Sequence, residues 1–236
     1  MAVAAESRRH LPLVRYALFA LSVPTVVLVL VHVGVGSYHR YVDAVPTAVR
    51  AVDLGLDGSL PSWWNTSLLL VNAGVALVLA VLTRPARRPS SRSWLIAALA
   101  FAYLALDEGL GLHERLKGPG QALAAALDIQ VRTYAWVLPG AVLALAGLAV
   151  FAWWCQALPV DVRRRFVLAV GTFFTGALVV EALNGYLRSR GANTLHLAGT
   201  TVEECLEMAG CVLAVGAMLR LVQVDATTRS ATLRAS

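Results

Sequence analysis

The sequence predicts an all-α polytopic membrane protein, a bundle of six transmembrane helices with both termini in the cytoplasm. Of its 236 residues, 58% are hydrophobic and only 14% are charged, whereas soluble domains carry roughly 25% charged residues. The mean hydropathy of +0.68 agrees with this composition. Several apolar runs reach the ~20 residues that an α-helix needs to cross a ~30 Å hydrocarbon core. Basic residues gather in alternate loops, as the positive-inside rule requires.

The polar stretches between the apolar runs are too short to fold separately, so residues 1–223 are expected to form one membrane domain. The predicted spans are 12–36, 62–83, 94–113, 134–156, 166–187 and 202–223. Pro24 favours a kink in the first span, and Trp63 and Trp64 suit a membrane interface at the start of the second. Residues 224–236 are polar and are expected to form a disordered cytoplasmic tail.

The distribution of arginine predicts the orientation of the bundle. Arginines are dense in the N-terminal segment, in the loop 84–92, in "DVRRR" and in the tail, whereas the loops 37–61, 114–133 and 188–201 are closer to neutral. Because the basic residues flank spans, the net charge of +6 indicates topology and no nucleic-acid partner is expected. The expected location is the plasma membrane, with the lipid bilayer as partner; the oligomeric state is open.

Acidic residues collect at the extracytoplasmic ends of the third, fifth and sixth spans. The stretches "LDEGLGLHERL" (106–116) and "TVEECLEMAG" (201–210) carry most of them, together with His113. Seven of the 14 acidic residues belong to this group: Asp107, Glu108, Glu114, Glu181, Glu203, Glu204 and Glu207. A charge near the bilayer centre costs from ~3 to more than ~10 kcal/mol. Carboxylates that share one depth therefore need protons, cationic partners or a metal ion.

Some of these acidic residues could instead have structural roles, in helix capping or in ion pairs. Thr201 followed by two glutamates is also typical of a capped helix start, where the helix dipole favours acids in the first turn. Glu108 could pair with Arg115, and Glu181 with Arg188.

Helical geometry limits how many of these groups can meet. One straight helix cannot aim all four ionisable groups of 107–114 at a single point. Either Gly109 and Gly111 let the third helix unwind, or only part of the set joins the site. Asn65 fits a glycosylation sequon, but it adjoins a span, so we discount that interpretation.

The leading hypothesis is a divalent-metal site near the extracytoplasmic face, in a metal-dependent hydrolase that acts on a lipid or lipid-linked substrate. The expected metal ligands are drawn from Asp107, Glu108, His113, Glu114, Glu181, Glu203 and Glu207. Carboxylates combined with imidazole favour Zn, Fe or Mn over Ca or Mg. The expected catalytic carboxylates are Asp107, Glu108 and Glu204, one of them a general base toward a metal-bound water.

Known motifs narrow this hypothesis without naming a reaction. The chain has no Glu-x-x-His of di-iron bundles, no HExxH and no GxSxG. A proton- or cation-coupled transporter or channel is the first alternative, and it predicts polar residues that continue toward the cytoplasmic side. Asn72, Thr172 and Thr175 are few for such a path. A non-catalytic membrane assembly partner is the second alternative.

The pattern "LDE…HE" closing one helix and "EE..LE..G" opening the last resembles a family of uncharacterised bacterial multipass membrane proteins. Asp107, Glu108 and His113 contribute to the first motif, and Glu207 and Gly210 to the second. The resemblance implies a membrane location and brings no substrate. The alkaline-ceramidase and progestin-receptor superfamily is similar in placing a metal site inside a helical bundle, but its HxxxH pair is missing here, so the likeness is one of chemistry.

Overall fold

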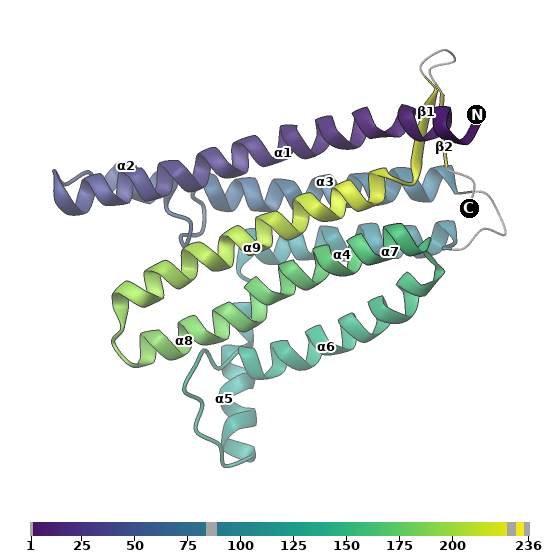
Figure 1. The fold of residues 1–236 in the computed structure, drawn as a ribbon. Helices are drawn as coiled ribbons and strands as arrows, with labels where there is room; N and C mark the ends of the chain where they lie inside the picture. The colour runs from purple at the N-terminus through teal and green to yellow at the C-terminus, as the bar shows by residue number, and fades with distance from the viewer. Residues whose placement is uncertain (1, 84–88, 226–229, 234–236) are drawn as a thin grey trace.

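The computed structural model describes residues 2–83, 89–225 and 230–233 as an elongated bundle of long helices that run side by side (Figure 1). The long helices are α1 (Ala2–Tyr41), α3 (Leu60–Leu82), α4 (Ser91–Leu110), α6 (Val137–Trp154), α7 (Val160–Phe174) and α9 (Asn193–Leu219). A π-helical turn, η3 (Thr175–Val180), joins α7 to α8 (Glu181–Ser189) in one column. The short elements are α2 (Pro46–Val52), η1 (His113–Leu116), α5 (Lys117–Ala126) and η2 (Cys155–Ala157).

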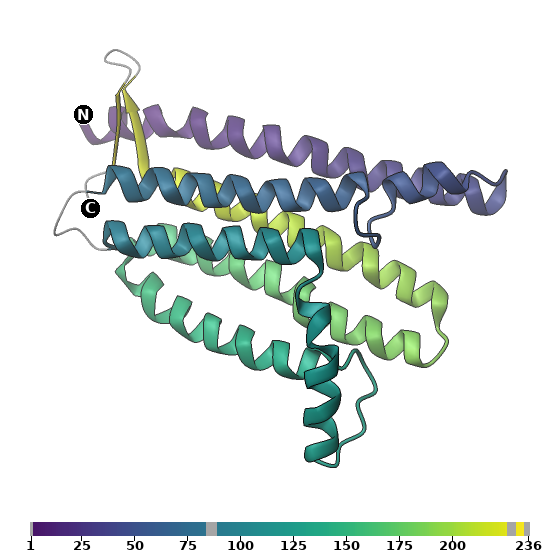
Figure 2. The same cartoon turned by 180° about the vertical axis from the view of Figure 1, so that it is seen from behind.

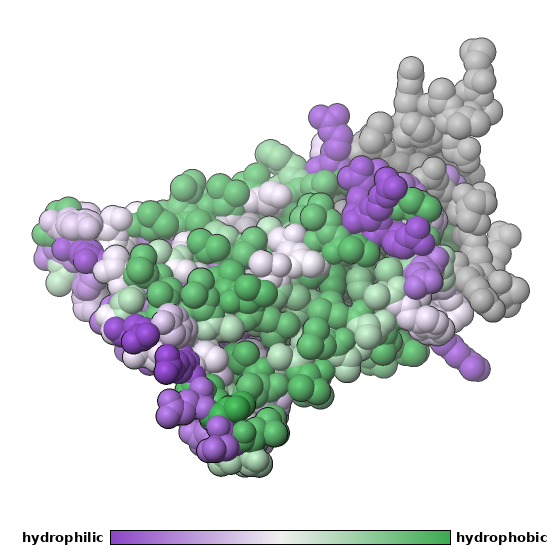
Figure 3. Space-filling view, turned by 60° about the horizontal axis from the view of Figure 1, so that its bottom comes forward, coloured by the Kyte–Doolittle hydropathy of each residue, from purple (hydrophilic) through white to green (hydrophobic). Residues whose placement is uncertain are grey.

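Five helical segments are long and apolar enough to cross a membrane, which agrees with a multi-pass membrane protein. They are Leu13–Tyr41, Leu60–Leu82, Ser91–Leu110, Val137–Ala157 and Val160–Ser189, and each overlaps one of the first five predicted spans. The surface shows a broad hydrophobic band between two ends where hydrophilic residues gather (Figure 3). α9 covers most of the predicted sixth span, but it includes three glutamates and is not among the five.

Of the helix boundaries that differ from the sequence prediction, two matter for the acidic residues. α9 begins at Asn193 rather than near residue 202, so Glu203 and Glu204 lie about three turns inside the helix. The interpretation of these residues as first-turn acids capped by Thr201 is therefore wrong. α4 ends at Leu110 rather than at residue 113, because Gly111 adopts a left-handed conformation with φ 55° that closes the helix.

The chain also forms elements that the sequence did not predict. α2 and α5 lie in segments expected to be loops, and Figure 2 shows α5 standing away from the bundle. The expected disordered tail differs as well: β1 (Val222–Asp225) pairs antiparallel with β2 (Ser230–Leu233), with Val222 opposite Leu233. The hairpin forms there because Val222 is buried in an apolar core and Leu233 packs against that core. Residues 226–229 and 234–236 lie outside the described residues.

α9 is the central helix, and it packs against α1, α3, α7 and α8. Small residues on α9 let its neighbours approach closely, as in membrane helix pairs generally. A Cβ at Gly210 would lie 2.7 Å from the backbone nitrogen of Phe173 and 2.9 Å from the carbonyl oxygen of Ala169. The long interior is filled by two apolar cores, one around Met208 and Val212 and one around Met218 and Phe166.

We name the two ends of the bundle by their charge. The acidic end carries Asp107, Glu108, His113 and Glu181, near the end of α4 and the start of α8. The basic end carries Arg163–Arg165 at the start of α7.

Gly210→Ala should destabilise the bundle, because the added methyl group meets the α7 backbone. Overpacking of this kind costs about 1–3 kcal/mol, so the melting temperature of the detergent-solubilised protein should fall. Gly147→Ala is the matched control, since nothing lies within 4 Å of a Cβ at that position of α6. Equal melting temperatures for the two variants, measured by tryptophan fluorescence, would contradict the close α7–α9 contact.

Candidate metal centre

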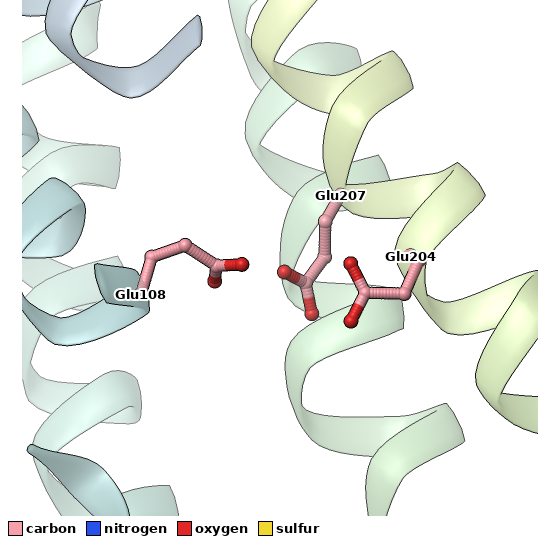
Figure 4. A group of neighbouring side chains, drawn as sticks. All are labelled: Glu108, Glu204 and Glu207. Carbon is pink, nitrogen blue, oxygen red and sulfur yellow. The ribbon is translucent and has the colours of Figure 1, made fainter. Parts of the chain in front are cut away.

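Three glutamates from two helices converge inside the acidic end. Glu108 lies near the end of α4, while Glu204 and Glu207 are three residues apart on α9 and so lie on neighbouring faces of that helix. One carboxylate oxygen from each lies within 4.8 Å of the other two. Figure 4 shows Glu108 reaching from α4 toward the two glutamates of α9. We call these three residues the glutamate trio.

An asparagine from a third helix bridges the trio. The Nδ2 of Asn65, on α3, donates hydrogen bonds to Glu108 Oε1 at 3.1 Å and to Glu207 Oε2 at 3.2 Å. Asn65 is fully buried and Glu207 is 7% exposed. Asn65 therefore binds α3 to both α4 and α9 at the level of the trio.

Two oxygen atoms at the trio are left without a hydrogen-bond partner in the described part of the chain. They are Asn65 Oδ1 and Glu204 Oε2, and both are buried. A buried polar atom without a partner costs about 1–3 kcal/mol. Rotation of the Asn65 amide about its last bond would exchange its nitrogen and oxygen, so this side chain can present either a donor or an acceptor to the trio. Buried oxygens without partners beside clustered carboxylates are atoms that could hold a divalent cation.

Asp107 and His113 form a separate pair beside the trio. The turn at Gly111 brings His113 back over the end of α4, so its backbone N–H donates to Asp107 Oδ1 at 2.7 Å and its Nδ1 lies 3.0 Å from Asp107 Oδ2. The other ring nitrogen lies 3.9 Å from Glu181 Oε1. The ring also packs against Trp136, with centroids 4.5 Å apart. Both nitrogens of His113 thus face carboxylates outside the trio.

The surroundings of His113 favour its charged form. Burial lowers the pKa of the ring, but the hydrogen bond with Asp107 and the negative charges of Asp107, Glu181 and Glu114 outweigh burial and raise the pKa to about 9. His113 is therefore protonated at neutral pH, and it supplies a positive charge within the acidic end.

The π-helical turn η3 helps to set the spacing between the α7–α8 column and α9. Gly176 lies so close to α9 that a Cβ there would be 2.8 Å from the carbonyl oxygen of Glu203 and 3.0 Å from Cγ of Glu207. Single π-helical turns occur frequently at functional sites. The column continues into α8, where Glu181 opens the helix and Asn184 donates a hydrogen bond to Glu203.

The structure divides the predicted ligands into groups. Glu108 and Glu207 share the trio with Glu204, which was predicted to be catalytic. Asp107 and Glu181 face His113, and Glu203 is held by Asn184. The carboxylate of the remaining predicted ligand, Glu114, lies beside the turn at Gly111. Among the residues that the structure describes, the ion pairs of these acids join Asp107 and Glu181 to His113, and none joins an acid of this end to Arg115 or Arg188.

Sequence reasoning missed the polar residues that support the acids. Asn65 was considered only as a glycosylation site, yet it is 0% exposed and faces the bundle interior. The signal was present, because Ser62, Asn65 and Asn72 recur at helical spacing on the buried face of an apolar helix. Asp57 was also missed: it lies in the α2–α3 loop, and its Oδ2 would lie 3.8 Å from a Cβ added at Gly111.

A family model described as "Domain of unknown function (DUF8692)" matches residues 17–221. The chain belongs to this family. The match covers most of α1, all of α2 to α9 and every residue of the trio, so the acidic end is part of the DUF8692 domain. The expectation of a family without an assigned function is confirmed. Comparisons with curated proteins and with solved structures gave no match.

The charge on His113 should make stability depend on pH. Because its pKa is about 9 in the folded protein and about 6.5 when unperturbed, the stabilisation is complete below about pH 6.5 and is lost as the pH rises through about 9. The melting temperature of the wild type should exceed that of His113→Gln most at pH 6, and the difference should shrink by pH 9.5. A difference that stays constant from pH 6 to pH 9.5, in the presence of a chelator, would contradict the ion pair.

Proposed function

We propose that this chain binds one divalent cation through Glu108, Glu204 and Glu207 and uses it to hydrolyse a lipid or lipid-linked substrate. The observation that carries the proposal is the convergence of three carboxylates, of which Glu207 is buried and Glu108 and Glu204 are partly buried, beside two buried oxygens of Asn65 and Glu204 that have no hydrogen-bond partner in the described residues. Like charges at this spacing repel one another unless protons or a cation neutralise them. A divalent cation satisfies the charges and the spare oxygens together.

The donor set favours a hard cation. The trio offers oxygen atoms only, and the imidazole of His113 is engaged by Asp107 on one side and faces Glu181 on the other. Carboxylate and carbonyl oxygens suit Mg²⁺, Ca²⁺ and Mn²⁺. Mn²⁺ is the ion we propose first, because it fits the oxygen donors and was also among the ions that the sequence favoured. Zn²⁺ and Fe²⁺ are less favoured than the sequence suggested, since the expected imidazole ligand is turned away.

The neighbouring residues can supply the proton transfers of an ester or amide hydrolysis. A cation held by the trio would supply Lewis-acid activation of water or of the substrate carbonyl or phosphoryl oxygen. Glu203, held by Asn184, would accept the proton of the attacking water. Protonated His113 would donate its proton to the leaving oxygen or nitrogen, and Asp107 would position the ring. The hydroxyl of the water joins the acyl carbon or phosphorus, the bond to the leaving group breaks, and the leaving group takes the proton of His113. Return of the proton from Glu203 to His113 through solvent would restore both residues, so one water is consumed and the atoms balance.

The number of spans and their orientation in the bilayer can be proposed from the glutamates of α9 and the arginines of the basic end. We propose that α9 is a sixth span, since it lies at the centre of the five apolar helices and its glutamates face α3 and α4. With six spans both termini would share one side, and the arginines of the basic end favour the cytoplasm for that side. The acidic end then faces the extracytoplasmic surface of the plasma membrane, at the depth of lipid headgroups.

The interior beyond the trio supports an enzyme over a transporter. Asn72 donates hydrogen bonds to the carbonyl oxygens of Leu68 and Cys211, and the hydroxyls of Thr172 and Thr175 bond to their own helix. Toward the basic end an apolar core extends from Ala76 to Val222, and the hydroxyl of the buried Thr83 donates to the carbonyl oxygen of Leu79 in its own helix. A cation path would need polar groups there.

Metal analysis tests the binding half of the proposal. We expect one divalent ion per chain in protein purified without chelator, and at least a tenfold weaker Mn²⁺ affinity in Glu207→Gln, since loss even of an outer-shell partner typically costs 10–100-fold. Asp43→Asn is the matched control, because it removes the same charge from an exposed residue near the same end. Unchanged ion content in Glu207→Gln, measured by elemental mass spectrometry, would refute the site.

Lipid hydrolysis tests the catalytic half. Wild-type protein incubated with total lipid extract of the expression host should release water-soluble headgroups or free acyl chains, detected by mass spectrometry. EDTA and Glu204→Gln should each abolish the release, and Mn²⁺ should restore it after EDTA treatment, while Asp43→Asn should behave like the wild type. If the protein binds metal but releases no headgroups or acyl chains in a Glu204-dependent way, the cation site would be supported and the hydrolase activity would be rejected.

A further inference from the structure

A mostly apolar groove lies at the basic end, far from the trio along the helices. A groove of about 450 Å³ opens between α6 and α7, and its lining includes Leu148, Phe151, Gln156, Arg163, Val167 and Gly171. The lining contains one cationic side chain and no acidic one. The groove therefore has a positive charge that its own walls do not neutralise.

The groove exists because α6 is held mainly near its ends. No residue of α6 itself is buried. Near the acidic end the preceding residue, Trp136, packs against His113, and near the basic end Phe151 and Trp154 pack against Phe166. Figure 2 shows α6 diverging from the neighbouring helices along much of its length. A helix of this kind leaves an open lateral face in the bilayer.

The two polar residues of the groove lie together at one end of it. Gln156, in η2, and Arg163, near the start of α7, adjoin the turn that joins α6 to α7. Leu148 and Gly171 lie eight residues farther into α6 and α7, about 12 Å away at 1.5 Å per residue. The walls of the groove are almost wholly apolar, with a cationic side chain at one end, which suits the acyl chain and the charged headgroup of an anionic phospholipid.

We propose that this groove binds one anionic phospholipid, with its phosphate at Arg163 and an acyl chain along Phe151, Val167 and Gly171. Arg163 is the fourth residue of the apolar segment Val160–Ser189, so its charge lies at headgroup depth. Arg164 and Arg165 are exposed beside it and increase the local positive potential. Basic pockets between transmembrane helices are recurrent sites for anionic lipid headgroups.

Native mass spectrometry of the full-length protein tests this site with phosphatidylglycerol and phosphatidylcholine of the same acyl chains. We expect one phosphatidylglycerol to bind about fivefold more tightly than phosphatidylcholine, the ratio that corresponds to one arginine near a membrane surface. Arg163→Gln should reduce this preference to less than twofold. Arg164→Gln should keep it, because the same charge is lost from a residue outside the groove.

A second variant tests the acyl-chain half without changing the charge. Ala152 lines the groove and is exposed, so Ala152→Trp should fill the groove and weaken binding of both lipids. The proposal is overturned if the wild type shows no preference, if Arg163→Gln and Arg164→Gln lose the preference equally, or if Ala152→Trp binds both lipids as the wild type does. Equal losses would indicate diffuse surface attraction.

Discussion

The electrostatic cost of burying carboxylates in an apolar bundle is the constraint on which the acidic end depends. Three glutamate oxygens lie within 4.8 Å of one another, in a helical bundle whose neighbouring segments are apolar enough to span a membrane. Neither a helix N-terminus nor an arginine relieves this repulsion, because Glu204 lies three turns inside α9 and the nearby cation is His113. Polar side chains of neighbouring helices donate hydrogen bonds to these carboxylates. Asn65 donates to two of the carboxylates, and Asn184 donates to the adjacent Glu203.

The same constraint explains the local irregularities of the backbone. Gly111 ends α4 and turns the chain so that His113 returns to Asp107, which a continued helix would not allow. Gly176 in the π-helical turn lets the α7–α8 column approach α9 beside Glu207. A left-handed residue and a π-helical turn are both departures from the regular α-helix. Both occur within one turn or two of the acidic side chains, whereas α3 crosses the same level as a regular helix.

The membrane class and the approximate helices could be predicted from the sequence, because composition and run length report directly on lipid exposure. The depth of the acids could be predicted for the same reason. Their grouping could not, since it depends on side-chain directions set by the end of α4 at Gly111 and by the early start of α9. Asp107 and Glu108 are adjacent in the chain, yet one binds His113 and the other joins the trio. Asn65 was missed because its spacing from Ser62 and Asn72 predicts only a buried helix face, whereas its role depends on which helices that face contacts.

Proton release on cation binding tests the central claim most directly. Carboxylates that share one buried site must be neutralised by protons when no cation is bound, so a cation that enters must displace protons. Addition of Mn²⁺ to weakly buffered, chelator-treated protein should release protons into the medium in proportion to the bound ion. The variant with Glu108, Glu204 and Glu207 all changed to Gln should release none above background. Mn²⁺ binding without proton release, or equal release by the wild type and the triple variant, would contradict the account.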